Sequence, residues 1–126
     1  MNNPKKVLIA EDSSVIQNLT RKILSIQNFE IKSVKNGQQV LDEMGKDNYN
    51  IILMDINMPV MDGIECTQKI RALEDPQKSK VPIIAITGNA RNLSVQEYND
   101  LGINELLQKP LNFDELVTLV KKYTAD

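Results

Sequence analysis

Residues 51–63 read IILMDINMPVMDG, an apolar run that ends on the carboxylate of Asp55 and is followed by Pro59 and Gly63. An apolar run of this length between turn residues predicts a strand that is covered on both faces of a sheet. Side chains just beyond the carboxyl end of such a strand lie where open α/β sheets bind ligands. Asp55 is therefore the first candidate functional residue.

The length and charge of the chain limit its possible functions. The 126 residues fit one domain, residues 1–126, which can bury about two thirds of the surface of the unfolded chain. The 15 basic and 17 acidic residues give a net charge of −2, so there is no broad positive field to hold nucleic acid or anionic lipid. Direct binding to nucleic acid or to a membrane is therefore not expected.

Cys66 is the single cysteine, and the chain contains no histidine. One cysteine excludes an internal disulfide and a cysteine-rich metal site, and it suits a reducing cytoplasm. Without histidine, any chemistry must rest on carboxylates, hydroxyls, lysine or arginine. The polar N-terminus and the short apolar runs predict neither a signal peptide nor a membrane span, and we expect a cytoplasmic location.

Five apolar or alternating runs predict strands, which alternate with five predicted helices. The strands are expected at 5–10, 29–34, 51–55, 81–86 and 104–108. The helices are expected at about 14–26, 37–45, 63–73, 90–101 and 112–123, and the polar stretch 74–80 is expected to be a surface connection. This alternation predicts a doubly wound α/β fold with a parallel sheet between two layers of helices. The most apolar early strands belong in the middle, which gives the order 2-1-3-4-5.

Two of these helices carry more detailed expectations. In the first helix, the apolar spacing predicts one buried face, formed by Val15, Ile16, Leu19, Ile23 and Ile26. The polar residues between them are expected to face water: Gln17, Asn18, Arg21 and Lys22. The helix at 90–101 has only a thin apolar stripe and is expected to be the most mobile one. Its Tyr98 either covers that helix or lies on an exposed partner face.

Polar side chains follow four of the predicted strands. Because parallel strands end at one edge of the sheet, five distant residues should meet there: Glu11, Asp12, Asp55, Thr87 and Lys109. Three carboxylates this close repel one another and raise at least one pKa, unless a cation lies among them. Oxygen ligands without histidine or cysteine favour Mg²⁺. A carboxylate beside a metal ion, a lysine and a hydroxyl suits phosphoryl transfer, in which the carboxylate attacks to form an acyl phosphate.

The chain resembles the receiver domain of two-component response regulators over nearly its whole length. The similarity is carried by Glu11-Asp12, residues 54–63 (MDINMPVMDG), Thr87 and Lys109-Pro110. It implies a flavodoxin-like (βα)5 fold of three layers, as in chemotaxis regulators and the receivers of hybrid kinases. Whether the chain is a stand-alone regulator or a receiver within a longer protein stays open at this point.

The resemblance also implies roles for the residues at the sheet edge. Asp55 would accept a phosphoryl group from a phosphohistidine on a histidine kinase or a histidine phosphotransfer protein. Mg²⁺ would be bound by Asp12, Asp55 and the backbone carbonyl of Asn57, with Glu11 acting through a water molecule. Beyond self-phosphorylation and self-dephosphorylation that depend on Mg²⁺, no enzymatic activity is implied.

Further implications concern the end of the last strand and the output of the domain. Thr87 and Lys109 would contact phosphoryl oxygens, and the Lys109–Pro110 bond would be cis. Many receivers carry an aromatic residue three positions before the lysine, where this chain has Leu106. Leucine has neither a ring nor a hydroxyl, so we expect any coupling to run through Thr87 and repacking of residues 88–106. A downstream effector would bind the surface formed by residues 90–123.

Two other classes of protein share part of this pattern. A phosphatase with an aspartyl nucleophile also needs Mg²⁺, a lysine and a hydroxyl, but it generally places a second acid two positions after the nucleophile. That position is Asn57 in this chain. A flavodoxin-type redox carrier shares the topology, but it needs a phosphate-binding loop after the first strand, where Glu11 and Asp12 would repel the anion.

Overall fold

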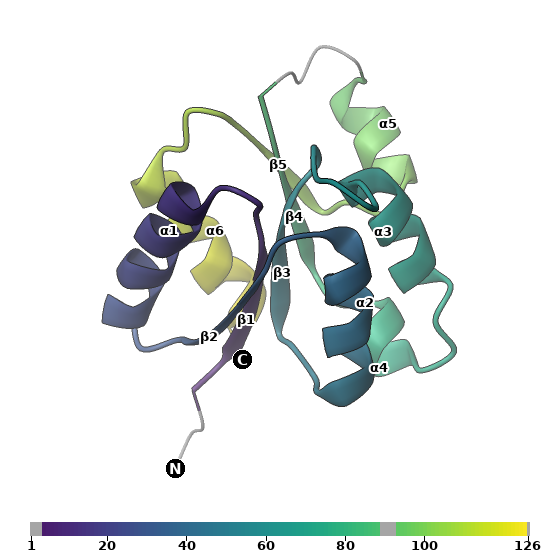
Figure 1. Cartoon of the computed structure of the whole chain (residues 1–126), viewed down its shortest axis with the longest axis horizontal. Coiled ribbons are helices and arrows are strands. Elements are labelled where there is room, and N and C mark those ends of the chain that lie inside the picture. Colours follow the sequence, from purple (N-terminus) through teal and green to yellow (C-terminus); the bar gives the residue numbers. More distant parts are fainter. Residues whose placement is uncertain (1–3, 89–92, 126) are drawn as a thin grey trace.

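A five-stranded parallel sheet forms the centre of the computed structural model, which describes residues 4–88 and 93–125 (Figure 1). The strands are β1 (Lys6–Ala10), β2 (Glu30–Val34), β3 (Ile51–Asp55), β4 (Ile83–Thr87) and β5 (Glu105–Gln108). They are hydrogen-bonded in the order β2-β1-β3-β4-β5. The predicted doubly wound α/β fold and its strand order are therefore confirmed.

Helices cover both faces of the sheet (Figure 1). One face carries α1 (Ser14–Ile26) and α6 (Phe113–Thr124). The other face carries α2 (Gly37–Lys46), α3 (Gly63–Arg71), α4 (Pro76–Ser79) and α5 (Val95–Asp100). The strands β2 and β5 form the two edges, so the alternating strand predicted at 29–34 lies at a sheet edge as its partly polar pattern requires.

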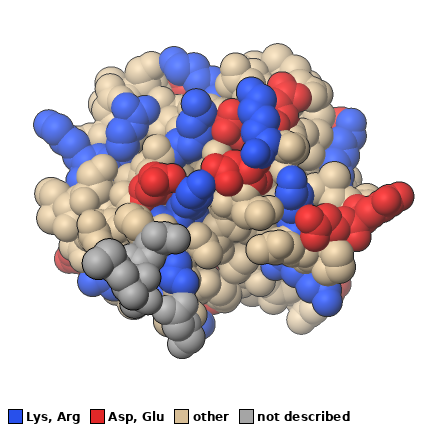
Figure 2. Space-filling model, turned by 90° about the horizontal axis from the view of Figure 1, so that it is seen from below, with Lys and Arg blue, Asp and Glu red and all other residues tan. Residues whose placement is uncertain are grey.

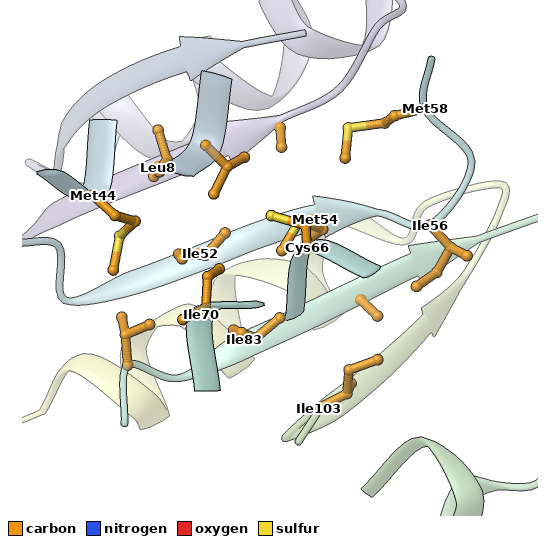
Figure 3. Packing of buried hydrophobic residues seen from close by; sticks show 14 of the residues in the cluster. Leu8, Met44, Ile52, Met54, Ile56, Met58, Cys66, Ile70, Ile83 and Ile103 are labelled. Carbon is orange, nitrogen blue, oxygen red and sulfur yellow. The ribbon is translucent and has the colours of Figure 1, made fainter. Parts of the chain in front are cut away.

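The central strand β3 is buried along its whole length and contributes to both cores. Because successive side chains of a strand point to opposite faces, Ile52 and Met54 pack under α2 and α3, whereas Ile51 and Leu53 pack under α1 and α6. Figure 3 shows the first of these cores, in which Ile52 and Met54 lie among side chains from β1, α2, α3 and β4. Both ends of β3 are thereby fixed, including Asp55.

Cys66 lies in this core on α3 and is fully buried (Figure 3). Burial raises the pKa of its thiol to about 12, so the thiol stays protonated at neutral pH. The face of the molecule seen in Figure 2 carries interspersed acidic and basic side chains. None of the helices in the described residues combines the length and the apolar character needed to cross a membrane.

The helix α1 packs through a different face from the one predicted. Gln17, Thr20 and Leu24 are buried, whereas Val15, Leu19 and Ile26 of the predicted apolar face are exposed. Ile16 and Ile23 lie at the margin and are half-buried. The side-chain amide of Gln17 donates to the backbone carbonyls of Glu11 and Val34, so the observed rotation of the helix satisfies this buried polar group. The prediction that Gln17 faces water was wrong.

The polar stretch 74–80, predicted to be a connection, contains the short helix α4. Asp75 caps this helix by accepting a hydrogen bond from the backbone N–H of Gln77, and Pro76 occupies its first turn, where a missing N–H does no harm. The Arg71 guanidinium at the end of α3 donates to the carbonyl of Ser79 over 2.7 Å and so holds the end of α4. With α4, the described residues contain six helices, and the prediction of five was too low.

The predicted helix at 90–101 is described only in part. Residues 89–92 lie outside the described residues, and α5 begins after Ser94, which forms a capping box with Glu97. Tyr98 is 2% exposed and belongs to the core beneath α2 to α5. Of the two alternatives, it therefore packs between α5 and the core and does not lie on an exposed partner face. The greater mobility expected of this helix stays a prediction.

We predict opposite effects on stability for two glycine-to-alanine substitutions. A Cβ at Gly63 would lie 2.6 Å from the Asp55 carbonyl oxygen, so Gly63→Ala should lower the free energy of unfolding by about 1–3 kcal/mol. A Cβ at Gly45, near the end of α2, meets no atom within 4 Å, so Gly45→Ala should raise it by up to about 1 kcal/mol. Urea denaturation measures both values, and a neutral Gly63→Ala would contradict the close approach.

Candidate functional site

The carboxyl ends of the strands bring the predicted site residues to one edge of the sheet. Asp55 is the last residue of β3, and Thr87 is the last residue of β4. Glu11 follows β1 directly, and Lys109 follows β5 directly. Backbone hydrogen bonds extend the pairing beyond the strands, because Glu11 N donates to Val34 O over 3.0 Å and Lys109 N donates to Thr87 O over 2.8 Å. The loops that leave the sheet are therefore held at their first residue.

Three carboxylates form a cluster at this edge. One oxygen each of Glu11, Asp12 and Asp55 lies within 4.8 Å of the other two. Asp12 is exposed, whereas Glu11 and Asp55 are only 3% and 1% exposed. Negative charges this close and this poorly hydrated repel one another strongly, so the cluster is stable only with protons or positive charge nearby.

Lys109 supplies one positive charge to the cluster. Its Nζ donates a hydrogen bond to Asp55 Oδ2 over 2.9 Å and lies 3.7 Å from Glu11 Oε1. Burial alone would lower the pKa of Lys109, but the hydrogen bond and the charge of Asp55 outweigh it and raise this pKa. The second oxygen of Asp55, Oδ1, accepts a 3.0 Å hydrogen bond from the backbone N–H of Asn57. The Asp55 carboxylate is thus oriented from two sides.

Glu11 has one satisfied and one unsatisfied carboxylate oxygen. Oε2 accepts a 3.0 Å hydrogen bond from the backbone N–H of Ser13, whereas the buried Oε1 accepts none from the described residues. Burial raises the pKa of Glu11 to about 7, and the negative charge of Asp55 raises it further against the effects of Ser13 and Lys109. A buried oxygen without a donor, among other hard oxygen ligands, fits a divalent cation such as Mg²⁺.

The loop after β3 carries Asn57, and backbone hydrogen bonds fix it at its base and at its tip. Gly63 N donates to Ile56 O over 2.8 Å, which closes the loop at its base. At its tip, Met61 N donates to Pro59 O over 2.7 Å around Val60, whose φ is +69°. This is a γ-turn, a strained conformation for a β-branched residue, and Val60 is 80% exposed there.

The remaining predicted residues lie at or near this edge. Thr87 is 2% exposed at the end of β4, and the Lys109–Pro110 bond is cis as expected. Leu106 is half-buried on β5 and packs against the core beneath α2 to α5. Gln17 donates through its side-chain amide to the loop after β1, and it was not among the residues predicted from the sequence. The sequence offered only one indication of this role, namely a polar residue between the apolar residues of the first helix.

The strand order, the acidic cluster and the nearby lysine define a class of small doubly wound α/β domains with a carboxylate site at the sheet edge. Residues 7–121 match the family model of the response regulator receiver domain. The chain therefore belongs to the response regulator receiver domain family.

Curated relatives contain this domain within much longer chains. Hybrid signal transduction histidine kinase I of Dictyostelium discoideum is 34% identical over 132 residues, which cover 98% of this chain and 8% of that protein. Transcription factor SKN7 of Candida albicans is 34% identical over 125 residues, which cover 98% of this chain and 22% of that protein. The chain thus spans less than a quarter of the length of either relative.

Solved receiver structures share the whole fold. The receiver domain of sensor histidine kinase PA1611 from Pseudomonas aeruginosa PAO1 has a TM-score of 0.87 and is 31% identical, with 98% of this chain and 100% of that chain covered. That crystal structure has a magnesium ion coordinated in the active site cleft. Chemotaxis response regulator CheY4 of Vibrio cholerae has a TM-score of 0.86 and is 27% identical, covering 96% of this chain and 99% of that one.

The raised pKa of Glu11 predicts a pH-dependent stability of the metal-free protein. The folded state holds the Glu11 proton up to about pH 7, whereas the unfolded state releases it near the ordinary value of 4.5. The free energy of unfolding should therefore fall as the pH rises from about 4.5 to about 7, by on the order of 3 kcal/mol. Urea denaturation at several pH values in a chelating buffer measures this slope.

Glu11→Gln removes the titrating group while keeping the shape of the side chain, so it should remove most of this slope. The matched control is Glu74→Gln, which neutralises an exposed carboxylate and should leave the slope unchanged. A Glu11→Gln protein with the wild-type slope would show that another group controls the pH dependence.

Proposed function

We propose that Asp55 is the phosphoacceptor of this receiver domain and takes its phosphoryl group from a phosphohistidine on a partner. The observation that carries this proposal is the position of the Asp55 carboxylate, 2.9 Å from the Lys109 ammonium and within the cluster formed with Glu11 and Asp12. The given sequence contains no histidine, so the phosphohistidine that donates the group must lie outside it. A histidine kinase or a histidine phosphotransfer protein supplies it.

The transfer is a displacement at phosphorus. An Asp55 carboxylate oxygen attacks the phosphorus atom, a new O–P bond forms, and the P–N bond to the donor imidazole breaks. The imidazole nitrogen keeps the electron pair of the broken bond and remains on the donor. Lys109 neutralises charge on the transferred group, and the hydroxyl of Thr87 donates a hydrogen bond to a phosphoryl oxygen.

A divalent cation fits beside Asp55. Asp12, Asp55 and the backbone carbonyl of Asn57 would hold Mg²⁺ directly, and Glu11 would act through a water molecule. When bound, Mg²⁺ supplies positive charge that offsets both the carboxylates and the phosphoryl oxygens. The same residues would support self-phosphorylation by small phosphodonors and later self-dephosphorylation. Oε1 of Glu11 supports this assignment, because it is buried and accepts no hydrogen bond from the described residues, although Lys109 Nζ lies 3.7 Å away.

The phosphorylated domain signals through residues 90–123. The new phosphoryl group adds a charge of about −1.5 to −2 at the sheet edge, which can bias the arrangement of a nearby loop and helix. Thr87 ends β4 and leads into the segment before α5, so its movement toward the phosphoryl group repacks Tyr98 and Leu106. An effector protein or domain reads this surface, and the whole exchange takes place in the cytoplasm.

A phosphatase with an aspartyl nucleophile is not favoured. The position two residues after Asp55 is Asn57, whose side-chain amide cannot act as a general acid and base at neutral pH.

The direct test uses Mg²⁺ and phosphoramidate, followed by mass spectrometry of the intact protein. The wild type should gain one phosphoryl group in an acid-stable, base-labile form, and Asp55→Asn should gain none. Asp62→Asn is the matched control, because Asp62 is an exposed acid of the same loop that only caps α3, a role asparagine can keep. Labelling of Asp55→Asn at the wild-type level would contradict the assignment, and multiple turnover of a phosphomonoester would favour the phosphatase.

A further inference from the structure

We propose that Gln17 is a positioning residue of the metal site, which holds the loop after β1 so that Glu11 and Asp12 bind a divalent cation. This inference rests on the proposed function of the carboxylate cluster. Gln17 lies on α1 and is 7% exposed. It is a buried polar side chain that takes no part in the proposed phosphoryl transfer. One of its hydrogen bonds goes to the backbone of Glu11, which together with Asp12 forms the acid pair.

The side-chain amide of Gln17 uses Nε2 to join the ends of two strands. Nε2 donates to the carbonyl oxygen of Glu11 over 3.1 Å and to the carbonyl oxygen of Val34 over 3.0 Å. Val34 is the last residue of β2, and its carbonyl also accepts a hydrogen bond from Glu11 N. Both the N–H and the C=O of Glu11 are therefore fixed, although Glu11 lies one residue beyond the end of β1.

The bond to the Glu11 carbonyl fixes the peptide unit between Glu11 and Asp12. Rotation of this peptide unit would move both side chains, and therefore both carboxylates of the acid pair. Within the described residues, little else restrains these carboxylates. Glu11 Oε2 accepts a hydrogen bond from Ser13 N, and Asp12 is exposed. Glu11 Oε1 accepts no hydrogen bond and has only the Lys109 ammonium nearby, at 3.7 Å. Repulsion from Asp55 pushes the pair apart, so the backbone must oppose it.

A purely structural role for Gln17 makes a different prediction. If the amide only satisfies two buried carbonyls, its loss lowers the stability of the fold and leaves the affinity for a cation unchanged. If it positions the acid pair, its loss weakens cation binding in protein that is still folded. Groups that orient metal ligands typically change metal affinity by about 10- to 100-fold.

The test compares two substitutions on the same helix. Gln17→Met keeps the length of the side chain and removes both hydrogen bonds to the loop. Thr20→Val is the matched control, because Thr20 is also buried on α1 and its hydroxyl donates to a backbone carbonyl, but that carbonyl is Ile16 O within the helix. Isothermal titration calorimetry with MgCl₂ gives the dissociation constant of each folded protein without any phosphodonor.

We expect Gln17→Met to raise the Mg²⁺ dissociation constant by about tenfold and Thr20→Val to leave it unchanged. With phosphoramidate, Gln17→Met should then be phosphorylated slowly at low Mg²⁺ and at nearly the wild-type rate when Mg²⁺ is saturating. A wild-type dissociation constant for Gln17→Met would overturn the inference. An equal loss of Mg²⁺ affinity in both variants would also overturn it, because a general destabilisation of α1 would then be the cause.

If Gln17→Met does not fold, Gln17→Asn decides the question in the same assay, because its amide is one methylene too short to reach the loop and should weaken binding similarly. The wild type separates this inference from the proposed function. A wild type that neither binds Mg²⁺ nor accepts a phosphoryl group refutes the proposed function. A wild type that does both, beside a Gln17 variant of equal affinity, refutes the role of Gln17 alone.

Discussion

Repulsion among three carboxylates is the constraint on which the rest of the site depends. Glu11, Asp12 and Asp55 bring oxygen atoms within 4.8 Å of one another, and two of these residues are almost completely buried. Buried carboxylates without compensating positive charge make a fold less stable than neutral residues at the same positions would. Lys109 compensates for one charge, and the proposed divalent cation would compensate for the others. The same excess of negative charge would favour the binding of a divalent cation such as Mg²⁺.

The sheet supplies the rigidity that this arrangement requires. Asp55 lies at the end of the most deeply buried strand, where packing on both faces prevents it from moving away from its neighbours. Three of the loops that leave the carboxyl end of the sheet are held at their first residue by a backbone hydrogen bond, at Glu11, Ile56 and Lys109. A site fixed in this way suits the proposed phosphoryl transfer, because the reacting groups keep their relative positions.

The sequence was sufficient to predict the strand order and which residues meet at the carboxyl end of the sheet, because both follow from general rules. Apolar runs identify buried strands, and parallel strands bring their carboxyl ends together, so Asp55 and Lys109 could be paired across 54 positions. The buried face of α1 could not be predicted in this way. Apolar spacing favoured a stripe through Val15 and Leu19, but hydrogen bonds from Gln17 to two carbonyls decided the rotation of the helix, and such bonds depend on where the sheet ends. The short helix after Asp75 was missed because its aspartate-proline start is also typical of a turn.

The most direct measurement locates the phosphoryl group after transfer from a phosphohistidine protein. Sodium borohydride reduces an aspartyl phosphate to homoserine, and peptide sequencing by mass spectrometry then identifies the modified position. The account predicts homoserine at position 55 alone, and only when both the phosphorylated donor and Mg²⁺ are present. Homoserine in place of Asp12 or Asp62, or loss of phosphate from the donor with no reducible aspartate in this chain, would contradict it.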